Sequence, residues 1–141
     1  MAVPQLRERA RRLAIRRPVL QNGFLEAGSP IAGTPLPQVD VGRGDRLRKL
    51  DDLLGYQFAL IASPGALRPV DLEWAAGRGI GVWRVGEDLD EPDGQLADWM
   101  EAKDSEFVLV RPDRIVFASG RAREMQRARD AFDRWTLAHD T

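Results

Sequence analysis

The most informative segment of this chain is residues 106–119, which read EFVLVRPDRIVFAS. Two short apolar runs, residues 107–111 and 114–119, flank a Pro-Asp turn. Runs rich in β-branched and aromatic residues on both sides of a tight turn are typical of a β-hairpin. We therefore expect two neighbouring antiparallel strands here, and the rest of the chain is interpreted outward from them.

Strand and helix patterns alternate around this hairpin. Residues 56–62 (YQFALIA) and 79–85 (GIGVWRV) are apolar runs bounded by turn residues, which predicts two buried strands. Apolar residues at helical spacing predict helices over 47–54, 69–77, 94–103 and 121–138. From residue 56 onward the order is therefore βαβαββα, in which helical crossovers join parallel strands. This order predicts an α/β fold with a thioredoxin-like core.

Individual side chains in these elements also have predicted roles. Asp93 precedes the third helix and belongs to the residue types that cap helix N-termini. The chain has four tryptophans at strand or helix positions that face the expected core: Trp74, Trp83, Trp99 and Trp135. We therefore expect Trp83, on the second strand, to be largely buried and to belong to the core instead of a ligand cage.

The beginning of the chain does not belong to this order. Residues 5–17 are expected to form a short basic helix with an apolar stripe made of Leu6, Ala10, Leu13 and Ala14. Pro18 ends that helix, and the Gly- and Pro-rich stretch after it predicts an extended connector. We divide the chain into an N-terminal helix and arm, residues 1–38, and a thioredoxin-like domain, residues 39–141.

The composition excludes several classes of site. The 141 residues include no cysteine and a single histidine, His139, near the end of the chain. Disulfides, thiolate metal sites and cysteine nucleophiles are therefore excluded. Ser63 follows the first strand, where active thioredoxin domains carry a thiol, but the sequence offers it no neighbouring base. We expect no catalytic residue and no metal site.

The charges are distributed unevenly along the chain. Residues 1–17 carry six arginines against one glutamate, and residues 86–106 carry nine acidic residues against one lysine. Arginine is frequent throughout, so we expect no nucleic-acid partner. Pro92 and Trp99 stand where a calcium loop needs oxygen ligands, so the acidic stretch is interpreted as a solvated loop. The basic residues 1–17 and the acidic residues 86–106 could attract each other between two copies of the chain. We therefore expect a homodimer in which the arm takes part and whose stability depends on salt.

Membrane and export signals are not expected. The longest apolar runs have about five to seven residues, whereas a membrane-spanning helix needs roughly 20. The arginine-rich opening lacks the apolar core of a secretory signal. We therefore expect a cytoplasmic protein with no membrane contact.

Three segments together resemble a known family. They are GTPLPQVDV (33–41), LRKLDDLLGYQFALI (47–61) and VLVRPDRIVF (108–117). In this order they resemble the C-terminal thioredoxin-like domain of class A flavin-dependent aromatic hydroxylases, of the phenol hydroxylase and 3-hydroxyphenylpropionate hydroxylase type. The second segment is also similar to the strand entry of peroxiredoxins. The motif residues, which we expect to be structural, are Gly33, Pro35, Pro37, Asp52, Gly55, Arg111, Pro112 and Asp113.

The resemblance implies FAD only in the larger enzymes. They bind it through a separate Rossmann unit in which a Gly-rich turn follows a strand. Here Gly77, Gly79 and Gly81 precede the strand, and 141 residues leave no room for flavin and substrate domains. We therefore expect no cofactor-binding residue in this chain.

We interpret the chain as a non-catalytic accessory domain that acts in domain packing or dimerisation. We do not expect it to be an enzyme on its own. Its expected partner is a flavin-containing hydroxylase body, a second copy, or both. One alternative is a free-standing thioredoxin-fold binding or scaffold protein with an unknown partner. Another is a cysteine-independent enzyme that uses Asp or Arg groups which the sequence does not locate.

Overall fold

The computed structural model describes Ser29 and residues 31–139. At its centre lies a four-stranded sheet in the order β4-β3-β5-β6. The strands are β3 (Ala59–Ala62), β4 (Gly81–Arg84), β5 (Phe107–Val110) and β6 (Val116–Gly120). β3 and β4 are parallel, whereas β5 is antiparallel to β3 and β6 is antiparallel to β5. The predicted hairpin is therefore confirmed.

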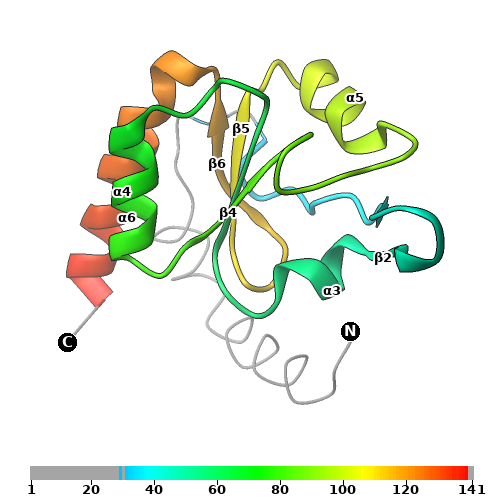
Figure 1. Ribbon diagram of the computed structural model, residues 1–141. Coiled ribbons are helices and arrows are strands. Elements are labelled where there is room, and N and C mark those ends of the chain that lie inside the picture. The colour runs from blue at the N-terminus through cyan, green and yellow to red at the C-terminus, as the bar shows by residue number, and fades with distance from the viewer. Residues whose placement is uncertain (1–28, 30, 140–141) are drawn as a thin grey trace.

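Helices cover both faces of this sheet (Figure 1). α4 (Pro69–Gly77) connects β3 to β4, and α6 (Met125–His139) follows β6; both lie on one face. α5 (Gln95–Ala102), which connects β4 to β5, and the short α3 (Leu50–Leu54) lie on the other face. From β3 onward the order is βαβαββα with a central antiparallel β5, so the predicted thioredoxin-like α/β fold is confirmed. The helix expected over residues 5–17 lies outside the described residues.

The face under α4 and α6 has an aromatic core. Phe132 of α6 packs edge-on against the ring of Phe58, with centroids 5.0 Å apart, and against Trp74 of α4 at 5.5 Å. Phe117 joins them because β6 contains a bulge, which turns both Phe117 and Ala118 toward this face. Met125, Ala128 and Phe132 of α6 are buried on this face.

The opposite face has an aliphatic core that is covered mainly by short segments. Leu50 and Leu54 of α3 are buried against the sheet, as are Leu96 and Met100 of α5. The connector also takes part, since Ile31, Leu36, Val39 and Val41 belong to the same cluster. The chain from Ile31 onward is therefore packed on the domain.

That connector covers the outer edge of β6. The hydroxyl of Ser29 donates to the carbonyl of Ser119 at 3.1 Å and accepts from its N–H at 2.9 Å. Farther along, Gly33 donates its N–H to the carbonyl of Val116 at 2.9 Å, and Val116 donates to the carbonyl of Thr34 at 2.8 Å. The edge strand β6 is thus paired along most of its length.

The helix predicted over residues 47–54 is wrong in its first half. Gly44–Arg46 form a 3-10 turn, and β2 (Arg48–Lys49) pairs antiparallel with β1 (Asp40–Val41). This small hairpin, with an ion pair of 2.9 Å between Lys49 and Asp40, commits residues 48–49 to extended backbone. The helix therefore begins only at Leu50, and Leu47 is exposed instead of packed.

Two further local expectations are wrong. Gly94, in the left-handed region at φ 64°, is the N-cap of α5, and Glu91 supplies the cap in place of Asp93. The Glu91 carboxylate accepts the N–H groups of Leu96 and Ala97, each at 2.8 Å. Trp83 is only partly buried, because β4 is an edge strand with a neighbour on one side only.

Candidate functional site

The β5–β6 turn forms a polar corner that contains much of the motif. Arg111 is only 6% exposed, and its Nε donates to Oδ1 of Asp113 at 3.0 Å. The same Asp113 oxygen accepts the N–H of Ile115 at 3.2 Å. Pro112 lies between the two charged residues and is half-buried. The carboxylate thus holds the turn from inside and neutralises the buried guanidinium.

Arg114 connects this corner to α3. Its guanidinium bonds the carboxylate of Asp51 and the carbonyl of Gly55, and it donates to the carbonyl of Asp51 at 3.1 Å. Its backbone lies in the left-handed region at φ 71°, a conformation that costs a non-glycine residue on the order of 1 kcal/mol. The side-chain contacts offset that cost. Sequence reasoning missed both Arg114 and Asp51, since only the fold brings residues 63 positions apart together.

The other motif residues surround the corner with one exception. Gly33, at φ 92°, turns the connector onto β6, and Pro35 forms a bridge with Ile115. Gly55 ends α3 at φ 70°. Pro37 is half-buried nearby in sequence, whereas Asp52 is exposed and its neighbour Asp51 makes the contact with Arg114. The motif is therefore arranged around a junction of three segments.

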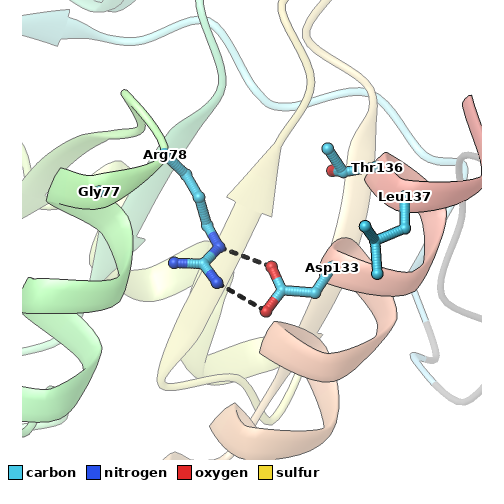
Figure 2. A pocket seen from close by; sticks show the side chains of 5 residues that line it. All are labelled: Gly77, Arg78, Asp133, Thr136 and Leu137. Carbon is cyan, nitrogen blue, oxygen red and sulfur yellow. Dashed lines mark hydrogen bonds and ion pairs between the residues drawn. The ribbon is translucent and has the colours of Figure 1, made fainter. Parts of the chain in front are cut away.

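A second feature is a hollow of about 390 Å³ between the C-terminal parts of α4 and α6. Figure 2 shows Arg78, which follows α4, and Asp133 of α6 reaching toward each other beside it. The hollow is lined by Gly77, Arg78, Asp133, Thr136 and Leu137. It has the size of a small ligand pocket, which is about 300–1,000 Å³ in most proteins.

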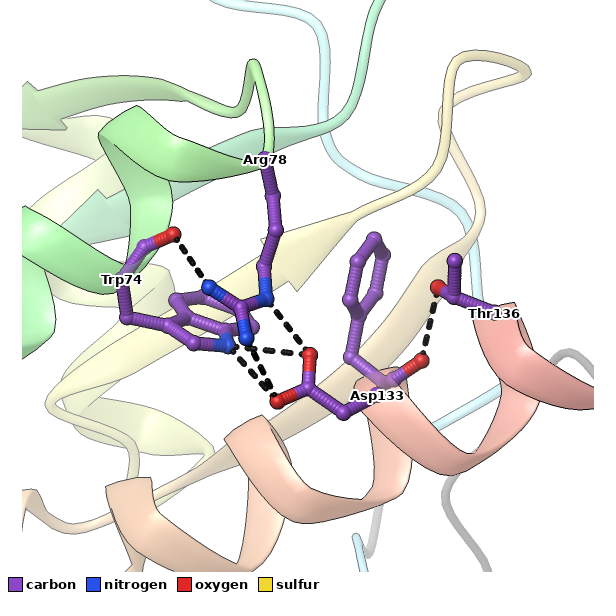
Figure 3. Close-up of polar contacts among 5 residues, drawn as sticks. Trp74, Arg78, Asp133 and Thr136 are labelled. Carbon is purple, nitrogen blue, oxygen red and sulfur yellow. Dashed lines mark hydrogen bonds and ion pairs between the residues drawn. The ribbon is translucent and has the colours of Figure 1, made fainter.

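The polar groups at the hollow already bond one another (Figure 3). The Asp133 carboxylate accepts from Arg78 Nε at 2.6 Å and Nη2 at 2.8 Å, and from the indole N–H of Trp74 at 3.1 Å. Arg78 Nη1 donates to the Trp74 carbonyl at 3.1 Å, and its guanidinium lies 5.2 Å from the Trp74 ring centroid. The Thr136 hydroxyl donates to the Phe132 carbonyl at 2.8 Å. These pairs cross-link the two helices and leave the exposed Leu137 as the apolar part of the lining.

A buried carboxylate near the start of α4 is also used for structure. Asp71 has a side chain that is 1% exposed, and its Oδ2 accepts the backbone N–H of Arg68 at 2.9 Å. Its other oxygen lies 3.1 Å from Nε of Arg129 in α6. Closed from solvent and balanced by a cation, this acid stabilises the packing of α4 on α6 and has no access to a substrate.

The described residues contain no recognisable catalytic constellation. The one marked titration feature is a surface turn after β4, where the hydrogen bond from Arg84 lowers the pKa of Asp88, and Asp88 in turn raises the pKa of Arg84. Within residues 29 and 31–139 no group of acidic or histidine side chains could hold a metal ion. No helix in this part is long and apolar enough to cross a membrane.

Comparison with known proteins identifies the family. A family model described as the HcaD C-terminal domain matches residues 33–135. The chain belongs to the HcaD C-terminal domain family. The match runs from the connector on β6 to the last turns of α6, so it includes the corner at the β5–β6 turn. Comparison with curated protein sequences gives no match.

Solved structures place this HcaD-type domain among flavin-dependent hydroxylases. The flavin-dependent monooxygenase PieE, in complex with FAD and substrate, is 25% identical over 74% of this chain, with a TM-score of 0.58. Aklavinone-11 hydroxylase, in a ternary complex with FAD and aklavinone, is 24% identical over 72% of this chain, with a TM-score of 0.56. The predicted resemblance to the C-terminal domain of flavin-dependent aromatic hydroxylases is confirmed.

The chain corresponds to only a small part of these enzymes. It spans 20% of the aklavinone-11 hydroxylase chain and 19% of the PieE chain. A thioredoxin domain of a thiol-disulfide oxidoreductase from Bacteroides vulgatus has a TM-score of 0.48 and 17% identity, and covers 74% of this chain. The relation to the hydroxylases therefore concerns one domain.

Proposed function

We propose that this HcaD-type domain is a non-catalytic packing module that associates with the flavin- and substrate-binding body of an aromatic hydroxylase. The main support for the proposal is the family match over residues 33–135. In the two similar hydroxylase structures, the part that corresponds to this chain is about a fifth of the enzyme. The other four-fifths of those chains is the body that our chain would contact. The FAD named in those complexes would then belong to the body.

The arrangement of polar groups supports a structural role. The charged side chains at the β5–β6 corner and between α4 and α6 bond partners within the domain. A catalytic acid or base must reach a substrate, whereas Asp71, Asp113 and Asp133 are each engaged by an arginine of the same domain. Such internally paired charges make rigid surfaces, which lose little entropy when they bind a protein.

The test is reconstitution. The chain is co-purified with an aromatic hydroxylase body from which its own C-terminal domain has been removed, and flavin absorbance is followed across gel filtration. We expect the chain alone to be colourless and the mixture to give a yellow complex that contains both. Stoichiometric flavin bound to the isolated chain, or aromatic hydroxylation by it alone, would show that the domain is not merely a packing module.

A second copy of the chain is the other candidate partner. Three acidic residues of the 86–106 region, Asp93, Asp98 and Glu101, form no ion pair with a described residue, whereas residues 1–17 carry a large excess of arginine. Light scattering of the full chain and of a variant lacking residues 1–18, at low and high salt, tests this. A dimer that dissociates at high salt and needs the arm supports it; monomers under all conditions contradict it.

The division at residue 38 and the cytoplasmic location stay predictions. Cell fractionation of a tagged chain tests the location. A variant that begins at residue 39 tests the division, which requires that residues 39–141 fold alone. The packing of Ile31 and Leu36 in the core predicts that this variant is less stable than one beginning at residue 29.

A further inference from the structure

The side chain of Leu137 is the most exposed large apolar group among the described residues. It is 77% exposed and lies at the hollow between α4 and α6, where Thr136 is its neighbour. Across the hollow Gly77 presents bare backbone, and a Cβ added to Gly77 would meet nothing within 4 Å. The hollow therefore offers both an apolar contact and room for a side chain (Figure 2).

The chemistry of the lining specifies an apolar occupant. A small polar ligand needs unpaired donors or acceptors to orient it. Here Arg78 and Asp133 bond each other in a two-point contact, Trp74 bonds Asp133, and Thr136 bonds the backbone of its own helix. Covering Leu137 with another apolar side chain leaves these bonds intact and removes apolar surface from water.

We propose that this hollow is the docking site of the apolar stripe of residues 5–17 of the same chain, with Leu6 and Leu13 as the contacting side chains. This segment needs such a surface, because a helix of its length is only marginally stable alone in water. In such a helix Leu6, Ala10 and Leu13 would share one face, and five of the six arginines would lie outside it; Arg17, in the last turn, would lie near that face. Docked this way, the arm would cover Leu137 and keep those five arginines in solvent.

The chain can reach the hollow. The connector is held at Ser29 on Ser119, close in sequence to the start of α6, and the 15 residues of α6 extend about 22 Å to the hollow. Residues 18–28 can extend to about 36 Å. A tether of this length gives the arm a millimolar effective concentration near its own domain, well above that of another chain in dilute solution.

The arm and the exposed end of α6 have one further property in common. The family match ends at residue 135, so Thr136 and Leu137 lie beyond it, and it begins at residue 33, so the arm lies before it. Both therefore lie outside the matched residues, at opposite ends of the chain. The docking concerns these flanking segments and does not depend on which face of the domain a hydroxylase body would contact.

Trypsin digestion tests the docking, because five arginines of the arm are potential cleavage sites; the sixth, Arg17, precedes Pro18, and trypsin does not cleave that bond. The rate of cleavage within residues 7–17 is measured for the full chain and for an isolated peptide of residues 1–28. We expect cleavage in the full chain to be at least tenfold slower than in the peptide. Leu137→Glu should raise it to nearly the peptide rate, and Leu13→Glu should have the same effect with no further increase in the double variant.

Matched controls separate docking from general destabilisation. Leu47 and Val70 are also exposed apolar residues, but they lie away from the hollow, so Leu47→Glu and Val70→Glu should leave arm cleavage unchanged. Protection that disappears on dilution would assign the occupant to a second copy and overturn docking within one chain. Cleavage of the full chain at the peptide rate, unaffected by Leu137→Glu, would overturn the proposal altogether, while flavin-body reconstitution would still test the packing function separately.

Discussion

The two faces of the sheet are closed in different ways. Under α4 and α6 the core is aromatic, and the two helices are cross-linked by arginine–aspartate pairs. On the other face the core is aliphatic, and it is covered by the five-residue α3, by α5 and by the connector. The first face depends on ring packing and buried charge, whereas the second depends on aliphatic packing and on the side-chain contacts of Arg114 that join the β5–β6 corner to α3. The faces should therefore respond differently to substitution.

Phe132→Ala should have the largest effect. Phe132 touches four other aromatic rings, and removing such a buried ring costs about 3–5 kcal/mol, a large part of a small domain's stability. Leu54→Ala on the opposite face should cost about 3 kcal/mol. Urea unfolding monitored by circular dichroism measures both. A smaller loss for Phe132→Ala than for Leu54→Ala would reverse the comparison between the faces.

Asp71→Ala should have the next largest effect. The substitution removes a helix cap and leaves Arg129 without its buried partner, which costs about 3 kcal/mol. Asp133→Ala, which breaks the half-exposed pair with Arg78, is the matched control on the same two helices and should cost about 1 kcal/mol. Thermal unfolding compares the two variants. Equal losses would show that burial of the charge is not what matters.

Substitution of Arg114 tests the corner that holds the aliphatic face. Arg114→Ala removes the contacts with α3 and leaves a non-glycine residue in the left-handed backbone region. It should therefore lower the free energy of unfolding by about 2 kcal/mol. Arg114→Gly loses the same contacts but relieves the backbone, so it should be about 1 kcal/mol more stable than Arg114→Ala. Melting temperatures of the two variants give this difference. If the alanine variant equals the wild type, α3 does not depend on this arginine.

The smallest effect concerns the surface turn after β4. The hydrogen bond from Arg84 lowers the pKa of Asp88, so this group stabilises the folded state above the unfolded-state pKa of about 3.9. The contribution is lost as the pH falls through the lower folded-state pKa. Asp88→Asn should therefore lower the free energy of unfolding by about a few tenths of a kcal/mol at pH 7 and by nearly nothing at pH 2. A constant difference between pH 7 and pH 2 would contradict this account.

Local patterns predicted most elements of the sheet and its long helices. Runs such as 107–111 are short, apolar and bounded by turn residues, and these features together favour a buried strand. The bounds predicted for α4 agree with the structure, since Pro69 is favoured in the first turn of a helix. The failures occur where a distant segment competes. Leu47 looked helical, but pairing of β2 with β1 extends the next two residues.

The candidate site was predicted only in part. Arg111 and Asp113 were singled out as motif residues, and they form an ion pair in the turn. Asp52 was singled out too, yet its neighbour Asp51 makes the contact, because helix geometry directs adjacent side chains to different faces. The hollow at Leu137 could not be predicted, since it is formed by two helices that meet only in the folded chain.

The sequence by itself determined the fold class, the family and the exclusion of cysteine chemistry. These follow from composition, from the order of periodic segments and from short motifs, which are all local properties of the chain. Only the tertiary structure decided which charges are paired, which face of the sheet is aromatic and where apolar surface stays uncovered. Those depend on contacts between residues far apart in sequence, such as Trp74 with Asp133 and Asp51 with Arg114, and no local pattern encodes such a pair.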